Sequence, residues 1–350
     1  VLEAIKMHRP DRCPIAHNPV PAALVKYGEK LIEIFKRYPQ DVVGIFAFQD
    51  LPESLVKVPG IKDLPLQFQG GSHKDEWGIV WNTKKDGIYG QVAKYPLKNW
   101  SDFDDYKFPP LPSDEKINKL EGDIRQMKEK GYFVSVGWEP GHFYERMWML
   151  RGFSNMLKDF ARRDERIYKF ADALLDYNLQ SLKRTLEAKP DIVCFTDDWG
   201  TQKSLMVNPS FWREVFKPRY KKMFDLVHKR KSLLWFHSDG YILDLIPDLH
   251  EIGVDVLNPQ FSCHSLEKIA EAVRNKLCVL SDIDRQYLLP RGTAEEIKDN
   301  VKKVVDLFGY RNNGGLICRG EINMDVPLEN VEVMYQAFIK YGKYDWSKVR

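Results

Sequence analysis

The sequence has few cysteines, little net charge and no long apolar run. Its five cysteines are widely spaced and form no CxxC pair, which argues against a disulfide framework and favours a reducing compartment. A formal net charge of +3 over 350 residues gives no reason to expect a nucleic-acid partner. No apolar run approaches the length that spans a bilayer, and the first residues lack a signal pattern. These absences predict a cytoplasmic enzyme with a small-molecule substrate, no nucleic-acid or membrane partner, and a monomeric or homodimeric state.

Short apolar runs alternate with amphipathic helical patterns along the chain. The strand-like runs lie at 41–48, 132–136, 191–195, 232–236, 254–257, 277–280 and 315–318. The helical patterns lie at about 22–37, 114–130, 143–160, 164–188, 209–230, 242–251, 265–274, 293–308 and 328–341. Such alternation predicts a parallel sheet, and an edge-like first strand at 13–16 brings the strands to eight.

We therefore expect an α/β fold of the (β/α)8 TIM-type barrel class, with residues 1–350 as a single domain. The region 50–111 differs from the rest, because it is rich in glycine, proline and aromatic residues and has no helix signal. It is predicted to form an irregular insertion over the barrel mouth.

The run 232–236 ends in His237 and Asp239, which stand two positions apart. Alternation along a strand puts residues i and i+2 on the same side, so these two side chains can converge on one target. Parallel α/β proteins bind ligands at the carboxyl ends of their strands. The pair thus predicts a functional site. The alternative is a histidine hydrogen-bonded to a neighbouring carboxylate that merely finishes the strand.

Polar residues follow the other predicted strands as well, and in a barrel they would face one cavity. The full set is His17, Asn18, Gln49, Asp50, Trp138, Glu139, Asp197, Asp198, Trp199, His237, Asp239, Asn258, Gln260, Asp282, Asp284, Arg285, Cys318, Arg319 and Glu321. Crowded carboxylates repel, so at least one should have a raised pKa or a counter-charge. The residues expected to move protons or position substrate are Glu139, Asp197, Asp198 and His237. The residues expected to bind substrate in an acid-rich, aromatic-lined cavity are His17, Trp138, Trp199, Gln260, Asp284, Arg285 and Glu321.

Metal binding is the sharpest hypothesis for this set. His237, Asp239 and a thiolate from Cys318 would supply nitrogen, oxygen and sulfur ligands to zinc and leave a fourth position open for substrate. Cys318 is far from the other two in sequence, and no compact ligand spacing is present. Nucleophilic catalysis by Cys318 with His237 is a further alternative, although the chain carries no known nucleophile signature.

The order of motifs resembles the uroporphyrinogen decarboxylase superfamily, which also contains cobamide-dependent methyltransferases. The motifs are Met7–Pro14, Asp75–Gly78, Asp197–Gly200, His237–Gly240, Ile246–Pro259, Ser281–Asp284, Gly292 with Thr293, and Gly320 with Val326–Asn330. The resemblance covers nearly the whole chain. It implies a (β/α)8 barrel with its active site at the carboxyl ends of the strands.

Two departures from the superfamily patterns bear on the reaction. Uroporphyrinogen decarboxylases carry an arginine-bearing stretch after the first strand to hold substrate carboxylates, whereas Ala16–Pro21 contains no arginine. This argues against the haem-pathway reaction. Zinc methyltransferases of the superfamily carry a His-x-Cys motif and a late cysteine. Here the matching positions are His237, Asp239 in place of the first cysteine, and Cys318, and aspartate is a harder zinc ligand than thiolate.

The resemblance implies a methyltransferase that moves a methyl group between a small substrate and a corrinoid protein or cofactor, with zinc assisting. One related group demethylates methoxylated substrates, which suits an acid-rich cavity. The alternatives are a metal-independent decarboxylase acting on an acid other than uroporphyrinogen, and a non-catalytic ligand-binding protein on the same scaffold. Release of carbon dioxide without a corrinoid would favour the decarboxylase, and ligand retention without turnover would favour the binding protein.

Overall fold

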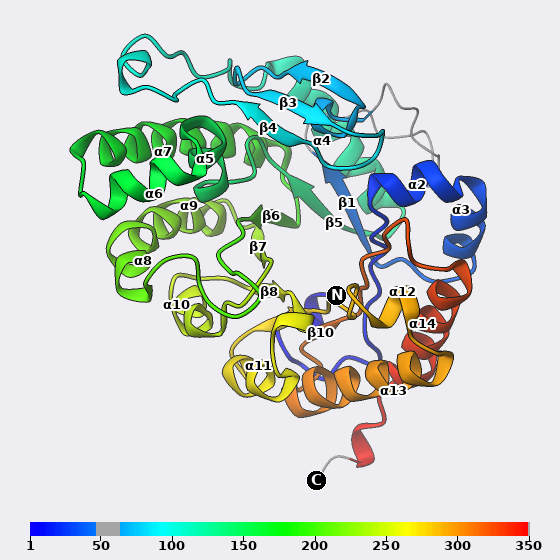
Figure 1. Cartoon of the computed structure of the whole chain (residues 1–350). Coiled ribbons are helices and arrows are strands. Elements are labelled where there is room, and N and C mark those ends of the chain that lie inside the picture. The colour runs from blue at the N-terminus through cyan, green and yellow to red at the C-terminus, as the bar shows by residue number, and fades with distance from the viewer. Residues whose placement is uncertain (47–63, 349–350) are drawn as a thin grey trace.

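A computed structural model describes residues 1–46 and 64–348, and its main sheet has seven parallel strands. In spatial order these are β1 (Val42–Phe46), β5 (Phe133–Gly137), β6 (Ile192–Thr196), β7 (Leu233–Ser238), β8 (Val256–Pro259), β9 (Cys278–Leu280) and β10 (Leu316–Ile317). Every neighbouring pair is parallel, as the strand–helix alternation predicted. The sheet curls, and helices surround it (Figure 1).

The two edges of the curled sheet, β1 and β10, meet through a short segment near the start of the chain. Ile15 bridges Cys318, just beyond β10, and Ala16 bridges Val42 in β1, both in parallel. The segment takes the place predicted for the first strand, although it pairs only through these isolated bridges. The arrangement is an α/β fold with a parallel curled sheet, consistent with a (β/α)8 barrel.

Helices connect successive strands and cover the outside of the sheet (Figure 1). They are α1 (Leu2–Ile5), α2 (Pro21–Tyr27), α3 (Glu29–Lys36), α4 (Asp114–Glu129), α5 (Tyr144–Arg151), α6 (Phe153–Ala161), α7 (Glu165–Thr185), α8 (Pro209–Val215), α9 (Lys217–Lys229), α10 (Ile246–Glu251), α11 (Leu266–Val273), α12 (Leu288–Arg291), α13 (Ala294–Val304) and α14 (Leu328–Tyr341). In the described part of the chain, no helix combines the length and the apolarity that crossing a bilayer requires.

Three of the predicted helices are each divided in two. Gly28 separates α2 from α3 at a φ of 52°, and Gly152 separates α5 from α6 at a φ of 89°. Pro218 lies in the first turn of α9, where its missing N–H cannot continue the ladder of α8. Apolar periodicity runs through all three breaks, which is why the sequence pattern alone predicted continuous helices.

Residues 64–111 are more ordered than the irregular insertion that the composition predicted. They include a three-stranded antiparallel sheet of β2 (Gly71–Lys74), β3 (Val80–Thr83) and β4 (Gln91–Lys94). Each strand has four residues, and β2 and β4 are mostly exposed, so little apolar alternation marks them in the sequence. The segment after β4 is tied to α5 by the Leu97 N–H, which donates to the Leu150 carbonyl at 3.0 Å. The predicted strand-end residues Gln49 and Asp50, and the rest of 50–63, lie outside the described residues.

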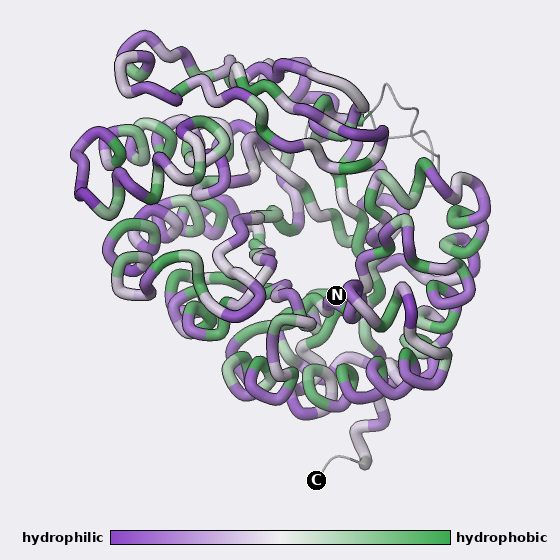
Figure 2. The backbone as a smooth tube through the Cα atoms, viewed as in Figure 1, coloured by the Kyte–Doolittle hydropathy of each residue, from purple (hydrophilic) through white to green (hydrophobic). Residues whose placement is uncertain are grey.

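Side chains alternate along the strands between the inside of the curled sheet and the helices. Residues from non-neighbouring strands pack together only on the inside, and this inner cluster contains Ala16, Ile192, Val256, Cys278, Leu280 and Ile317. Residues of the opposite parity, such as Val193 and Phe236, pack in the main core against the helices. Figure 2 shows hydrophobic and hydrophilic stretches alternating along those helices, as expected when one helix face is buried. The same alternation decides which polar residues at the strand ends face the mouth.

Candidate active site

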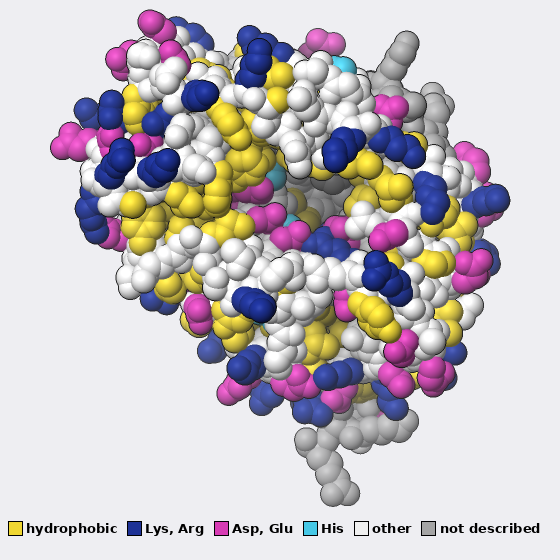
Figure 3. All heavy atoms as spheres, in the orientation of Figure 1, with side chains coloured by type: hydrophobic (Ala, Val, Ile, Leu, Met, Phe, Trp, Pro, Cys, Tyr) yellow, Lys and Arg dark blue, Asp and Glu magenta, His cyan; other side chains and the backbone are white. Residues whose placement is uncertain are grey.

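The loops at the carboxyl ends of the strands surround an open cavity of about 560 Å³. Figure 3 shows a central hollow in which acidic, basic and histidine side chains gather. The described residues that line the cavity are Gly200, Thr201, Gln202, Asp239, Gly240, Gln260, Arg285, Gln286, Glu321 and Asn323. This lining is mostly polar, and none of these ten residues is aromatic.

His237 and Asp239 face each other at the end of β7, as their spacing predicted. The imidazole Nε2 lies 3.2 Å from Asp239 Oδ1. On the other side of the ring, Nδ1 lies 3.0 Å from the Asn258 carbonyl oxygen and 2.8 Å from Asn258 Oδ1. Because a carbonyl oxygen can only accept, Nδ1 carries a proton. Burial lowers the pKa of His237, but the hydrogen bond and charge of Asp239 outweigh it and raise that pKa to about 9.

Asp198 joins this pair from the end of the neighbouring strand β6. Its Oδ1 accepts a hydrogen bond from the Asp239 N–H at 2.8 Å. Burial, together with the charges of Glu145 and Asp239, raises the pKa of Asp198. One ligand atom from each of Asp198, His237 and Asp239 lies within 4.8 Å of the others. A nitrogen and two oxygens that converge in this way match the donor set of a catalytic divalent-metal site.

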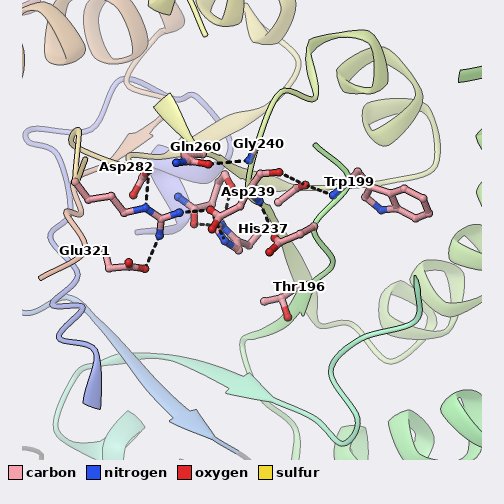
Figure 4. A network of polar contacts seen from close by, with 12 residues as sticks. Thr196, Trp199, His237, Asp239, Gly240, Gln260, Asp282 and Glu321 are labelled. Carbon is pink, nitrogen blue, oxygen red and sulfur yellow. Dashed lines mark hydrogen bonds and ion pairs between the residues drawn. The ribbon is translucent and has the colours of Figure 1, made fainter. Parts of the chain in front are cut away.

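Arg285 supplies the counter-charge for three carboxylates, those of Asp239, Asp282 and Glu321, which Figure 4 labels. Its Nη1 lies 2.7 Å from Glu321 Oε2, its Nη2 is paired with Asp239, and its Nε lies 3.9 Å from Asp282 Oδ2. The Arg285 side chain is only 11% exposed. Burial raises the pKa of Asp282 to about 6, although the charge of Arg285 opposes this shift. The guanidinium therefore holds together acidic groups that would otherwise repel one another.

Replacing Arg285 with methionine is expected to lower the free energy of unfolding by about 3 kcal/mol at neutral pH, because buried carboxylates lose their partner. The deficit should shrink below pH values of about 6, where Asp282 gains a proton. A raised carboxyl pKa means that the folded state binds more protons than the unfolded state, so acidification favours folding of the variant. Urea unfolding followed by circular dichroism measures both effects.

The matched control for that measurement is Arg163→Met. Arg163 pairs with Glu214 at 2.8 Å on the surface, where the two side chains are 67% and 50% exposed. Its loss should lower the free energy of unfolding far less than the loss of Arg285, because exposed ion pairs contribute little. Equal losses in the two variants would contradict the role given to Arg285.

Three predicted substrate-binding residues lie in the helix-facing layer and not in the cavity. The His17 ring stacks on Phe35 with 4.6 Å between ring centroids, and burial lowers the pKa of His17 to about 4. Trp138 and Trp199 are buried in the core between sheet and helices. Figure 4 shows the Trp199 indole pointing away from the polar network. In the alternation along its strand, each of the three side chains falls on the face that points toward the helices. This corrects the prediction that they contact substrate.

The structure also corrects the predicted metal set of His237, Asp239 and Cys318. Cys318 follows the inward-facing Ile317, so its side chain points toward the helices, where it is fully buried. Burial and a hydrogen bond with Cys13 raise the pKa of the Cys318 thiol well above its ordinary value. Because its side chain points away from the inside of the sheet, Cys318 does not join His237 and Asp239 in one ligand set. Asp198 occupies the position that Cys318 was predicted to fill.

Asp197 is a positioning residue and not the proton-transfer group that was predicted, because its carboxylate is only 2% exposed and fully occupied. Its donors, at 2.6 to 3.1 Å, are the N–H groups of Phe143, Tyr144 and Glu145 and the hydroxyl of Tyr220. Because side chains alternate along β6 and the loop after it, Asp197 points toward the helices and contacts α5 and α9. Its neighbour Asp198 points to the opposite side, where it contacts Asp239. These bonds fix the N-terminal end of α5 against the strand.

A second histidine–carboxylate pair, His142 and Glu145, stands on the segment that Asp197 fixes. His142 Nδ1 lies 3.1 Å from Glu145 Oε2 and 2.8 Å from both the carbonyl oxygen and Oγ1 of Thr196. One ligand atom each of His142, Glu145 and Asp197 also lies within 4.8 Å of the others, but the Asp197 oxygens already have four donors. This pair was not predicted, because it lies in the loop after β5 and not on a strand. The one signal in the sequence was a histidine three residues before a glutamate at the start of a helix.

The remaining predicted residues divide between the cavity and its border. Gln260, Arg285 and Glu321 line the cavity, and Gln260 Oε1 accepts from the Gly240 N–H at 2.8 Å. Glu139 Oε1 accepts from Trp77 Nε1 at 2.9 Å and from Arg146 Nη2 at 3.3 Å, which ties it to the segment between β2 and β3. Asp284 accepts from the backbone of Gln286 and Tyr287 in the turn after β9. Asn258 and Asp282, which belong to the predicted strand-end set without an assigned role, contact His237 and Arg285.

A curled parallel sheet with ionisable groups converging at its carboxyl ends defines the class of α/β barrel-like enzymes. The family model described as uroporphyrinogen decarboxylase (URO-D) matches residues 92–341. The chain therefore belongs to the URO-D family, and the resemblance inferred from its motifs is confirmed.

Among solved structures, the chain is similar to a methyltransferase from Methanosarcina mazei, with 16% identity, a TM-score of 0.68 and 97% of both chains covered. A GH113 beta-1,4-mannanase shares 8% identity at a TM-score of 0.44, with 96% of this chain and 100% of that chain covered. At 16% identity, the likeness to the methyltransferase shows a shared fold and nothing further. No curated protein matches the chain.

Proposed function

We propose that the chain is a metal-assisted methyltransferase of the URO-D family, which moves a methyl group between a small polar substrate and a corrinoid protein or cofactor. The observation that carries this proposal is the convergence of Asp198, His237 and Asp239, of which Asp239 lines the polar cavity. A methyltransferase from Methanosarcina mazei has a similar fold, so this fold is compatible with the reaction.

The donor set fits a divalent cation, and zinc is the first choice. The hydrogen bonds from Nδ1 to Asn258 orient the His237 ring with Nε2 toward the two carboxylates, which is the usual outer support of a metal-bound histidine. Burial and the charges of Glu145 and Asp239 raise the pKa of Asp198, and a cation held by these residues would offset the charge repulsion. Zinc held by these three residues would act as a Lewis acid on the substrate atom that carries the methyl group.

The other residues of the cavity select the substrate. A volume of about 560 Å³ accommodates a small molecule, and the lining offers mostly polar groups. Gln260 and Gln286 provide amide groups, while Arg285 stays committed to Asp239 and Glu321. Among the described lining residues, a substrate with eight carboxylates would find no free guanidinium, which argues against uroporphyrinogen. A methoxylated molecule with hydroxyl or carboxyl groups fits the lining better.

The reaction is tested with zinc-loaded protein, cob(I)alamin and a set of methoxylated hydroxybenzoates. We expect methylcobalamin to form, as followed by absorbance. His237→Ala should lower the rate by about a thousandfold, because Lewis-acid activation contributes several kcal/mol. His8→Ala is the matched control, since His8 is an exposed histidine outside the cavity. Carbon dioxide release from a carboxylic acid without corrinoid would establish the decarboxylase instead, and tight binding without turnover would establish the non-catalytic alternative.

A further inference from the structure

We propose that His142 is a second catalytic residue of this site, which donates a proton from Nε2 to the leaving oxygen of the substrate, and that Glu145 positions it. The inference rests on the proposed function for the nature of the leaving group. The geometry of the His142 and Glu145 pair stands independently of it.

The contacts of His142 leave one nitrogen for chemistry. The Thr196 carbonyl, 2.8 Å from Nδ1, can only accept, so Nδ1 carries a proton that Glu145 Oε2 at 3.1 Å also attracts. Among residues 1–46 and 64–348, Nε2 has no hydrogen-bond partner. The His142 side chain is 25% exposed while that of Glu145 is 14% exposed. Because Nδ1 faces the backbone, the exposed edge of the ring is the one that carries Nε2.

The segment that carries His142 is held rigidly. Asp197 accepts from three consecutive backbone N–H groups that begin directly after His142. On either side, the Gly141 carbonyl accepts from the Thr196 N–H at 3.2 Å, and the His142 carbonyl accepts from Asn178 Nδ2 at 3.4 Å. An acid fixed in this way needs no reorganisation when charge develops on the substrate.

His142 also lies close to the metal-ligand candidates. Its partner Thr196 is the direct parallel neighbour of His237 in the register of β6 and β7, and neighbouring strands are about 4.8 Å apart. Figure 4 shows Thr196 and His237 side by side at these strand ends. Glu145 also lies close enough to Asp198 for its charge to raise the pKa of that residue, which is one of the three candidate metal ligands. A substrate that contacts His237 is therefore within reach of the His142 ring.

The electrostatics keep this acid protonated. Burial lowers the pKa of His142, but the charge and hydrogen bond of Glu145 and the charge of Asp197 outweigh it, with Arg146 opposing them, and raise that pKa to about 9. The imidazole is thus a cation at neutral pH and has a proton on Nε2 to give.

In the proposed step, transfer of the methyl group is accompanied by transfer of the His142 proton. The bond between the methyl carbon and the substrate oxygen breaks, and its electron pair stays on the oxygen. The methyl carbon forms a new bond with the electron pair of a reduced corrinoid. The proton of Nε2 moves to the departing oxygen, and the neutral imidazole regains a proton from water.

The test compares two methyl aryl ethers, one whose phenol is a good leaving group and one whose phenol is a poor one. His142→Gln should lower the rate about a hundredfold or more for the poor leaving group and less than about tenfold for the good one, as expected for a general acid. His228→Gln is the matched control, because His228 also pairs with a carboxylate, Asp255 at 2.9 Å, outside the described site. It should leave both rates unchanged.

Two further outcomes separate this inference from the proposed function. If the unmodified protein transfers no methyl group, the proposed function fails and this step fails with it. If the unmodified protein is active but His142→Gln loses the same factor with both ethers, the acid assignment alone is overturned. A nuclear magnetic resonance titration needs no turnover. It should give a His142 pKa above that of a free histidine, and this pKa should be lower in Glu145→Gln. An ordinary His142 pKa would also overturn the assignment.

Discussion

Replacing Gly240 with alanine is expected to lower the free energy of unfolding by about 3 to 5 kcal/mol and to abolish activity. A Cβ atom on Gly240 would overlap the carbonyl group of Gly200 and lie 2.6 Å from its Cα. A Cβ atom on Gly200 would in turn overlap the backbone of Gly240 and Tyr241. The loops after β6 and β7 therefore touch backbone to backbone. Gly240 also has a φ of 75°, which an alanine adopts only under strain.

The activity is lost with the stability because the two loops carry the site. Asp198 lies two residues before Gly200, Asp239 directly precedes Gly240, and the two aspartates are joined by a hydrogen bond of 2.8 Å. Separating the loops to make room for a methyl group breaks this bond. Urea unfolding and the methyl-transfer rate measure the two effects.

Gly122→Ala is the matched control, because a Cβ at this position in α4 meets nothing within 4 Å. It should raise the free energy of unfolding by about 0.5 to 1 kcal/mol, as expected for glycine in a helix. If Gly240→Ala behaves like this control, the close crossing of the two loops does not support the site.

The two histidines of the site differ in which nitrogen is free. The Nδ1 of His237 hydrogen-bonds to Asn258 and its Nε2 faces Asp239, so Nε2 is one of the atoms that could coordinate a metal. The Nδ1 of His142 contacts Thr196 and Glu145, and its Nε2 has no partner among the described residues. The first arrangement suits a metal ligand and the second suits an acid, which allows one cavity to activate a substrate atom and protonate the leaving group.

The strand and helix positions could be predicted from the sequence because each strand is a short apolar run and each helix has one apolar face. The antiparallel sheet of β2 to β4 could not, since its strands are short and largely exposed. The splits at Gly28 and Gly152 were hidden because the apolar pattern continues across them.

The site could be predicted only where the face of a strand was known. Parity alone joined His237 to Asp239, and the structure bears out that geometry. After β6, alternation puts Asp198 on one face and Asp197 and Trp199 on the other. Both faces of a parallel strand are buried, so the sequence does not show which of the two faces the inside of the sheet. His142 and Glu145 come from a loop, where no strand rule applies.

The central claim is that Asp198, His237 and Asp239, and not Cys318, hold a divalent metal. Asp198→Ala and His237→Ala should each weaken zinc binding by more than about a hundredfold, because changing even an outer-shell partner costs about that much. Cys318→Ala should keep the metal, since the thiol is buried beside Cys13. Circular dichroism of each variant confirms that it is folded.

The most direct measurement is the zinc content of the four proteins by mass spectrometry after equilibration with zinc and gel filtration. We predict about one zinc per chain in the unmodified protein and in Cys318→Ala, and almost none in Asp198→Ala and His237→Ala, as expected for a site with three protein ligands. Loss of zinc in Cys318→Ala with retention in Asp198→Ala would contradict this assignment.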